Sequence, residues 1–124
     1  FKKINDTYGH NVGDLVLQRL SKEVEASIRN SDCFARFGGE EFILLVPNTS
    51  KEELSIFAEK IRVLIQNIEV KNDKKETVKI TISIGGTVYN KNESIESFIN
   101  RADISMYESK NKGRNTVSFN FSKK

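Results

Sequence analysis

The residues of this 124-residue chain that are best suited to chemistry lie in three short stretches. The first is Arg36-Phe37-Gly38-Gly39-Glu40-Glu41-Phe42, where two adjacent carboxylates follow a pair of glycines. A tight glycine turn lets the backbone approach a phosphate group while a carboxylate reaches a metal ion. An ordinary exposed turn explains the same residues, because glutamate side chains usually lie in solvent. The motif by itself favours that simpler interpretation.

The second stretch covers residues 1–14 and carries two side chains that could recognise a purine base. A carboxylate such as Asp14 accepts hydrogen bonds from the ring N–H and the exocyclic amine of guanine, and an amide such as Asn5 complements neighbouring acceptors. In the structural alternative, Asn5 and Asp6 form an Asx turn and Asp14 caps a helix. Both interpretations place these residues in a loop and at a helix start, so periodicity does not separate them.

The third stretch, Lys110-Asn111-Lys112-Gly113-Arg114-Asn115, gathers cations at the expected end of a helix. Cations in that position interact favourably with the helix dipole, which is a purely structural explanation. They would equally suit a triphosphate, because Arg presents a planar fork of donors and Lys a mobile point charge.

The hydrophobic pattern predicts the elements that position the first two stretches. Apolar residues recur every four positions over residues 12–28, widened by Leu15 and Leu17, and indicate an amphipathic helix that ends near Asn30. Residues 33–37 and 42–46 predict two short strands around the glycines, which together form a β-hairpin.

Two further helices are expected. Ser50 and Glu53 make a capping box for the first of them, and Ser94 starts the second, which Gly113 stops as a C-cap. The expected core face of the first comprises Leu54, Phe57, Ala58, Ile61, Leu64, Ile65 and Ile68. That of the second comprises Ile95, Phe98, Ile99, Ala102 and Met106.

Strands are expected on either side of the last helix. Alternating side chains over residues 78–84 predict a half-buried strand, Gly85-Gly86 marks a bulge or a close backbone approach, and residues 117–121 form a last strand. The order of elements predicts one α+β domain over residues 1–124, with a mostly antiparallel central sheet flanked by helices.

Composition narrows the function classes. The net charge is +3 and the isoelectric point near 9.0, yet acidic and basic residues are mostly interleaved and Trp is absent, which argues against a general nucleic-acid binder. With one cysteine, Cys33, and one histidine, His10, an internal disulfide and a Cys/His zinc cluster are excluded. No long apolar run or signal-peptide core is present, so we expect a cytoplasmic domain without membrane contact.

Taken in this order, the stretches resemble the GGDEF family of diguanylate cyclases. The matching motifs are Phe-Lys-x-Ile-Asn-Asp-x-Tyr-Gly-His-x-x-Gly-Asp from Phe1, Arg-Phe-Gly-Gly-Glu-Glu-Phe from Arg36, Thr-Ile-Ser-Ile-Gly at 81–85, Arg101-Ala102-Asp103 with Met106-Tyr107, and Lys110 with Gly113-Arg114-Asn115. Five motifs in sequence are far more specific than one, and they cover essentially the whole chain.

The resemblance implies a nucleotidyl-cyclase, palm-like fold that condenses two GTP molecules to cyclic di-GMP and releases two pyrophosphates. Each ribose 3′-hydroxyl would attack the α-phosphorus of the other GTP, with two divalent ions, usually Mg²⁺, at the site. Glu40 would bind metal and help to deprotonate the hydroxyl, with Glu41 beside it. The expected substrate contacts are Asn5 and Asp14 to guanine, and Lys110 and Arg114, assisted by Lys2, to the terminal phosphates. One GTP per subunit implies a homodimer.

The resemblance also makes Arg29-Asn30-Ser31-Asp32 an inhibitory site for cyclic di-GMP. Arg can chelate phosphate and stack on guanine, while Asp accepts hydrogen bonds from the guanine edge. The structural alternative is a charged helix end followed by a turn. Lys60 stands where some family members have an additional arginine for this site.

The family's first metal ligand is an aspartate on an opening strand upstream of the motif that begins at Phe1. We therefore expect a domain that is incomplete at its N-terminus, and little or no activity from the 124 residues alone. Sensor or receiver domains also usually lie upstream, so we expect one in the full protein, which could be a membrane-anchored sensor. The alternative function is a non-catalytic receptor that binds cyclic di-GMP through Arg29 and Asp32, or GTP through Asn5 and Asp14.

Overall fold

The computed structural model describes residues 10–38, 41–71 and 74–120. The chain divides into two compact units, one made of Phe1–Pro47 and Leu64–Ile80, the other of Asn48–Val63 and Thr81–Lys124. Among the described residues, no helix is both long enough and apolar enough to cross a membrane.

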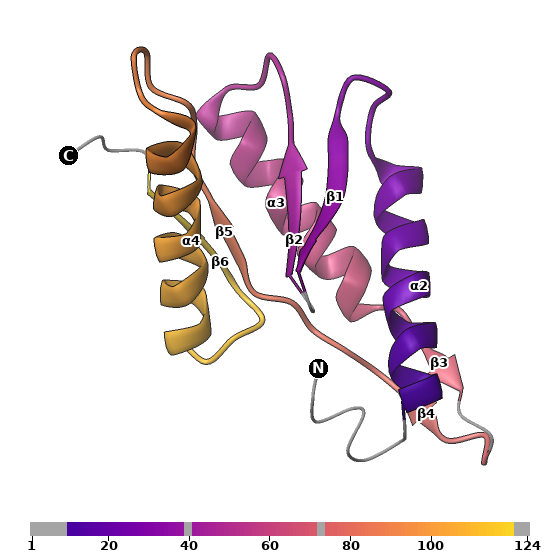
Figure 1. Cartoon of the computed structure of the whole chain (residues 1–124). Coiled ribbons are helices and arrows are strands. Elements are labelled where there is room, and N and C mark those ends of the chain that lie inside the picture. The colour runs from indigo at the N-terminus through magenta and orange to yellow at the C-terminus, as the bar shows by residue number, and fades with distance from the viewer. Residues whose placement is uncertain (1–9, 39–40, 72–73, 121–124) are drawn as a thin grey trace. The chain divides into compact units, whose positions relative to one another are not determined.

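The described residues of the first unit include helix α2 (His10–Ser27), the end of α3 (Lys51–Gln66) and two antiparallel strand pairs (Figure 1). Helix α2 precedes the hairpin formed by β1 (Cys33–Gly38) and β2 (Glu41–Leu45), and the short strands β3 (Val70–Lys71) and β4 (Thr77–Val78) form the second pair. The predicted helix and hairpin are thereby confirmed, although the helix ends at Ser27 rather than near Asn30.

The core of the first unit lies along α2. Val12 and Val16 are buried together with Val78, and Val70 and Ile80 pack against this cluster. The four-residue spacing of the sequence correctly identified this face of α2, whereas Leu15, which was expected to widen it, is exposed.

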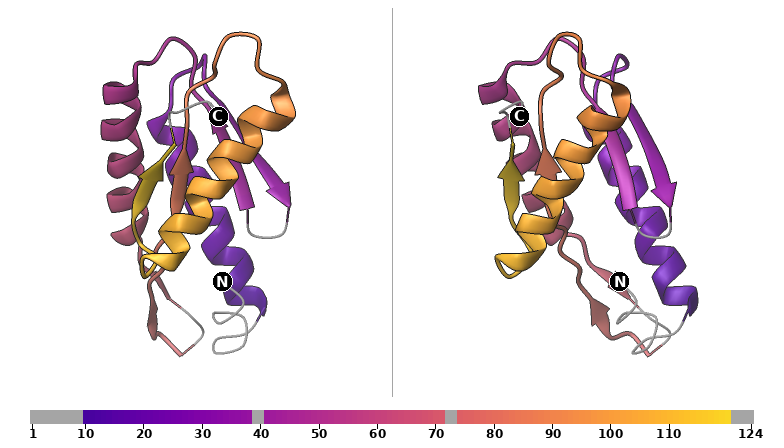
Figure 2. Two further views of the ribbon diagram at one scale, coloured as in Figure 1. Left: turned by 90° about the vertical axis from the view of Figure 1, so that its left-hand side faces the viewer. Right: turned by 60° about the vertical axis from the view of Figure 1, so that its left-hand side comes forward.

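The second unit contains most of α3 (Lys51–Gln66), then β5 (Ile84–Gly86), α4 (Ile95–Asn111) and β6 (Val117–Phe119). Strands β5 and β6 are parallel, and α4 is the crossover that connects them and packs on them, as both views in Figure 2 show. The predicted caps are present: Ser50 Oγ accepts from the Glu53 N–H at 3.1 Å, and Ser94 Oγ accepts from the Ser97 N–H at 3.1 Å. Of the three strand pairs in the described part of the chain, two are antiparallel, which confirms the α+β class.

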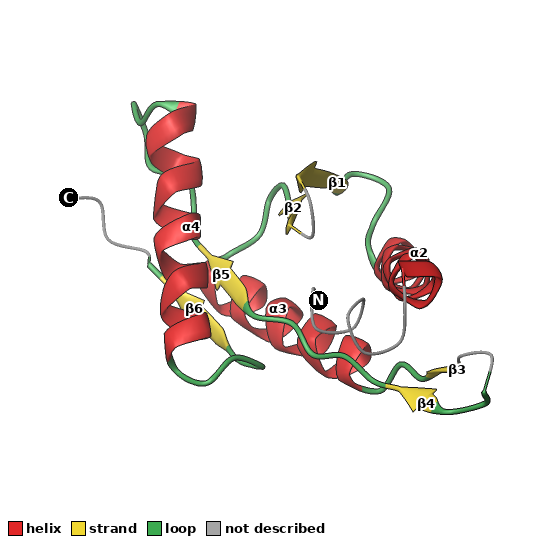
Figure 3. Ribbon diagram, turned by 60° about the horizontal axis from the view of Figure 1, so that its bottom comes forward, coloured by secondary structure: helices red, strands yellow, loops and turns green. Residues whose placement is uncertain are grey.

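The strand predicted over residues 78–84 is wrong in its extent. Strand β4 ends at Val78 and β5 begins at Ile84, and the segment between them is a loop (Figure 3). Alternating side chains make a strand only where a neighbouring backbone supplies hydrogen-bond partners, and within the described residues none pairs with this segment.

The predicted core face of α4 is wrong in part. Ile95 and Ile99 are 72% and 37% exposed, and the buried side chains of α4 are instead Arg101, Ser105 and Ser109. The face of α4 that packs on β5 and β6 therefore consists of small and polar residues in place of the predicted apolar ones.

The absence of a side chain at Gly85 of β5 explains why small residues of α4 are buried. A Cβ atom at Gly85 would overlap the carbonyl oxygen of Ala102 and the backbone nitrogen of Met106. Strand β5 thus lies directly against the backbone of α4, where small side chains such as serine fit and larger apolar ones do not. The predicted close backbone approach at Gly85-Gly86 is confirmed.

Candidate functional site

The turn of the β1–β2 hairpin carries the glycine and glutamate motif. The strand register shifts between Arg36 and Gly38, after which Gly38 pairs with Glu41, the first residue of β2. Glu41 is exposed, so its carboxylate is accessible to a cation, while Glu40 lies outside the described residues. Mg²⁺ needs only one or two protein carboxylates, because water and substrate phosphates complete its shell, and the chemistry of this turn fits that ion.

A wider ligand cluster is absent from the described part of the chain. Residues 10–38, 41–71 and 74–120 contain no group of three or more His, Cys, Asp or Glu side chains placed to hold a metal ion.

Two aromatic rings hold the hairpin in register. Phe34 of β1 and Phe42 of β2 stack with ring centroids 5.2 Å apart and planes inclined by 6°. Cross-strand aromatic pairs stabilise an antiparallel ladder, so the rings help to fix the turn that carries Glu41.

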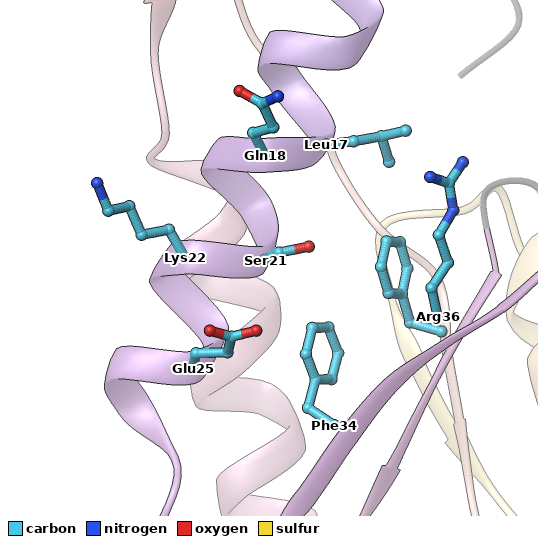
Figure 4. Close-up of a pocket in the computed structure, with 8 residues that line it drawn as sticks. Leu17, Gln18, Ser21, Lys22, Glu25, Phe34 and Arg36 are labelled. Atoms are coloured by element: carbon cyan, nitrogen blue, oxygen red, sulfur yellow. The ribbon is translucent and has the colours of Figure 1, made fainter.

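The same face of the hairpin forms one wall of an open groove of about 530 Å³, and α2 forms the other. Figure 4 shows Leu17 and Ser21 pointing from α2 toward Phe34 and Arg36 of β1. The complete lining is Leu17, Gln18, Ser21, Lys22, Glu25, Phe34, Arg36 and Phe42. Sequence patterns alone did not identify this groove, because its two walls come from separate elements.

Asp14 lies in the interior of α2, four residues after the helix begins at His10. The prediction that it caps the helix is therefore wrong. Its exposed side chain is not among those that line the groove, and it lies one helical turn before Leu17 and Gln18, which do. Lys2 and Asn5 lie outside the described residues.

Arg29 and Asp32 are brought together in the turn between α2 and β1. Asp32 accepts from the Arg29 backbone N–H at 2.9 Å, and its Oδ1 accepts from Arg29 Nη2 at 3.1 Å. Arg29 Nη2 also donates to the carbonyl of Pro47 at 2.7 Å. The aspartate side chain is 1% exposed and the arginine side chain 54% exposed, so a buried carboxylate holds a solvent-facing guanidinium.

The charge of this pair follows from its contacts. Burial alone would raise the pKa of Asp32, but hydrogen bonds from the Arg29 backbone and side chain, together with the Arg29 charge, bring that pKa below its ordinary value. Asp32 is therefore ionised at neutral pH.

Lys110 and Arg114 lie at the C-terminal end of α4, in the second unit. Lys110 occupies the last turn, and Arg114 is exposed in the turn that follows. Gly113 has a positive φ of 102°, which confirms its predicted role in ending the helix. Both cations therefore lie at the C-terminal end of α4, a position that is compatible with either interpretation.

Glu93 and Arg101 form a buried ion pair, although Arg101 was noted only as part of a family motif and Glu93 not at all. Arg101 Nη2 donates to Glu93 Oε1 at 2.6 Å, and Arg101 Nε donates to Glu93 Oε2 at 2.7 Å. Arg101 also donates to the carbonyls of Val88 and Asn120, at 2.7 and 3.0 Å. One side chain thus ties α4 to the chain segments that follow β5 and β6.

Comparison with known proteins gives one consistent family. The family described as "Diguanylate cyclase, GGDEF domain" matches residues 1–116. Diguanylate cyclase A of Treponema denticola is 46% identical over 119 residues, which are 95% of this chain and 32% of that protein. Diguanylate cyclase DosC of Escherichia coli K12 is 38% identical over 117 residues, 94% of this chain and 25% of that protein. The chain thus spans about a quarter to a third of the length of these relatives.

Comparison with solved structures gives the same family. The GGDEF domain of DgcB from Caulobacter crescentus, in complex with c-di-GMP, matches with a TM-score of 0.90 at 33% identity, over 95% of this chain and 70% of that one. Diguanylate cyclase SiaD from Pseudomonas aeruginosa, in complex with its activator SiaC, matches with a TM-score of 0.91 at 34% identity, over 96% and 45% of the two chains. This chain belongs to the GGDEF domain family of diguanylate cyclases.

Proposed function

We propose that the domain condenses two molecules of GTP to cyclic di-GMP and releases two pyrophosphates. The family match over residues 1–116 carries this proposal, because the matched region includes the Gly38-Gly39-Glu40-Glu41 turn, Lys110 in the last turn of α4 and Arg114 after it. Each reaction step is the attack of a ribose 3′-hydroxyl on an α-phosphorus, so the protein must bind nucleotide, hold metal and accept a proton.

Glu40 and Glu41 are the proposed metal-binding carboxylates, with two Mg²⁺ ions per active site. When bound, Mg²⁺ lowers the pKa of the attacking hydroxyl and neutralises charge on the leaving pyrophosphate. Glu40 also helps to take up the hydroxyl proton. The exposed position of Glu41 at the start of β2 supports this assignment, because substrate and solvent can reach it.

Different residues bind the guanine base and the terminal phosphates of GTP. Asn5 and Asp14 hold the guanine, and the exposed side chain of Asp14, one helical turn before the groove residues Leu17 and Gln18, supports this role. Lys110 and Arg114, assisted by Lys2, hold the terminal phosphates, which suits a point charge and a planar fork of donors.

Arg29 and Asp32 form the proposed site of product inhibition by cyclic di-GMP. The exposed guanidinium, oriented by the buried Asp32 carboxylate and the Pro47 carbonyl, supports this proposal. An arginine held in one orientation loses less entropy when it chelates a phosphate or stacks on a base.

The working assembly is a homodimer, because each subunit supplies one GTP. We also place the domain in the cytoplasm, downstream of a sensor or receiver domain in the full protein.

Turnover of GTP by the full-length protein tests the proposal. With GTP and Mg²⁺, chromatography should detect cyclic di-GMP, and Glu40→Ala should lower its rate by at least about a hundredfold. Glu69→Ala, which changes an exposed glutamate of the same unit, should leave the rate unchanged. Equal rates for wild type and Glu40→Ala would disprove the catalytic assignment.

The ordered Arg29–Asp32 pair also suits a second candidate, a receptor that binds cyclic di-GMP without turnover. Calorimetry distinguishes the two functions. Binding of cyclic di-GMP that Arg29→Ala abolishes, in a full-length protein that makes no product from GTP, would support the receptor.

A further inference from the structure

The turn that carries Arg114 has an unusual backbone. Three consecutive residues have positive φ: 102° at Gly113, 64° at Arg114 and 47° at Asn115. Glycine adopts this conformation freely and asparagine tolerates it, but it is unfavourable for arginine because of its Cβ atom. Such a conformation persists only where surrounding contacts hold it.

Backbone hydrogen bonds hold both ends of this turn. The Arg114 N–H donates to the carbonyl of Ser109 at 3.1 Å, which ties the turn to α4. The Ile84 N–H donates to the carbonyl of Thr116 at 3.0 Å, which ties the following residue to β5. Neither bond acts on Asn115, the last residue with positive φ.

Arg62 of α3 supplies the contact to Asn115. Its Nη1 donates to Asn115 Oδ1 at 2.8 Å, across 53 positions of sequence. Glu59 holds the same guanidinium through two hydrogen bonds, Nε to Oε1 at 2.7 Å and Nη2 to Oε2 at 2.6 Å. The Arg62 side chain is only 16% exposed and is therefore largely shielded from water, whereas the Glu59 side chain is 54% exposed.

We propose that Arg62 is a positioning residue for nucleotide binding: through Asn115 it keeps the turn left-handed and so directs the Arg114 side chain toward the terminal phosphates. The proposal rests on the phosphate-binding role proposed above for Arg114. The direction of a Cα–Cβ bond is fixed by φ and ψ, so relaxation of Arg114 to negative φ would turn its guanidinium away. Arg62 itself need not touch the substrate.

The test compares nucleotides with and without terminal phosphates. In the full-length protein, Arg62→Met should weaken binding of the α,β-methylene analogue of GTP by about fivefold in calorimetry, the effect expected of one lost hydrogen bond. Binding of GMP, which has no terminal phosphates, should stay within twofold. Arg19→Met is the matched control, because Arg19 also pairs with a glutamate on its own helix, Glu23, and should change neither affinity.

Two variants of Asn115 distinguish the loss of the Arg62 hydrogen bond from a change in backbone conformation. Asn115→Gly keeps the freedom to adopt positive φ but loses the acceptor for Arg62, whereas Asn115→Ala loses both. We therefore expect a larger loss of analogue affinity for alanine than for glycine. If Arg62→Met does not fold, Arg62→Lys and this pair carry the test.

A double variant shows whether Arg62 acts through Arg114. In an Arg114→Ala background, Arg62→Met should cause no further loss of analogue affinity. Equal losses for GMP and the analogue, or an additive double variant, would overturn the positioning role and leave the proposed function intact. If Arg114→Ala itself had no effect, the proposed phosphate contact would be wrong and the positioning role would fall with it.

Discussion

At the scale of single residues, the Arg29–Asp32 pair makes the clearest prediction about ligand binding. Arg29→Ala removes the exposed guanidinium and should weaken binding of cyclic di-GMP by roughly tenfold or more, because charge-assisted contacts to phosphate are lost. Calorimetry measures this change. Arg19→Ala, which removes a guanidinium from the exposed Arg19–Glu23 pair of α2, should leave the affinity unchanged; a similar loss in both variants would point to a general charge effect.

The pH dependence of that binding follows from Asp32. Its pKa lies below the ordinary value of 3.8, so the carboxylate stays charged and holds Arg29 throughout the range from pH 5 to pH 8. The contribution of the pair is present above the ordinary pKa and is lost only as the pH falls through the lowered one. Affinity for cyclic di-GMP should therefore be constant from pH 5 to pH 8, and a midpoint in that range would contradict this assignment.

The buried Glu93–Arg101 pair makes a prediction about stability. Glu93→Gln removes the charge that Arg101 needs in a buried environment and should lower the melting temperature by roughly 10 °C at pH 7. Hydrogen bonds from the Arg101 side chain lower the pKa of Glu93 to about 2, although burial alone would raise it. Hydrogen bonds from Asn90 and Ser97 and the charge of Arg101 lower it further. The contribution of the Glu93–Arg101 pair to the stability of the wild type is therefore complete above about pH 4.5. It is lost as the pH falls from that value to about 2.

Thermal denaturation at a series of pH values checks this prediction. The difference between wild type and Glu93→Gln should be constant at neutral pH and shrink below pH 4.5. Glu96→Gln, an exposed glutamate in the first turn of the same helix, should show a far smaller difference. Equal melting temperatures for Glu93→Gln and wild type at pH 7 would contradict a stabilising role.

At the scale of elements, the sequence predicted what local periodicity determines. The core face of α2 follows from apolar residues every four positions, and the caps at Ser50 and Ser94 follow from short side chains placed before helices. The buried face of α4 did not follow, because the close approach of β5 at Gly85 selects Ser105 and Ser109 in place of Ile95 and Ile99.

Among the residues with proposed roles, the sequence again predicted those that local motifs mark. The family motifs identified Arg29, Asp32 and Arg114, since each lies in a short conspicuous stretch. The contacts of Arg62 and the pairing of Arg101 with Glu93 were not predicted, because they join segments that only the fold brings together. Arg62 and Asn115 are 53 positions apart, and no local pattern connects them.

The contact between β5 and α4 makes the prediction that belongs to this scale. Gly85→Ala places a methyl group into the α4 backbone and should lower the free energy of unfolding by about 2 kcal/mol or more. Gly38→Ala is the matched control, because no atom lies within 4 Å of the position its Cβ would take. Urea denaturation should find Gly38→Ala within about 0.5 kcal/mol of wild type, and similar losses in both variants would argue against the close packing of β5 on α4.

At the scale of the whole molecule, the proposed chemistry needs two subunits, since each holds one GTP and the reaction joins the two. Product formation by the full-length protein should therefore depend on dimer concentration: below the dissociation constant of the dimer, the rate per subunit should rise in proportion to protein concentration and then level off. Cyclic di-GMP measured by chromatography over a dilution series, with the oligomeric state followed by analytical ultracentrifugation, tests this.

Asp14→Ala, which should weaken guanine binding, provides a second test when it is mixed in excess with wild type. Mixed dimers then hold one GTP instead of two, so the activity of the wild-type subunits should fall as the variant is added. A rate per subunit that is independent of dilution in a range where the protein is monomeric, together with no inhibition by Asp14→Ala, would show that one subunit completes the reaction alone.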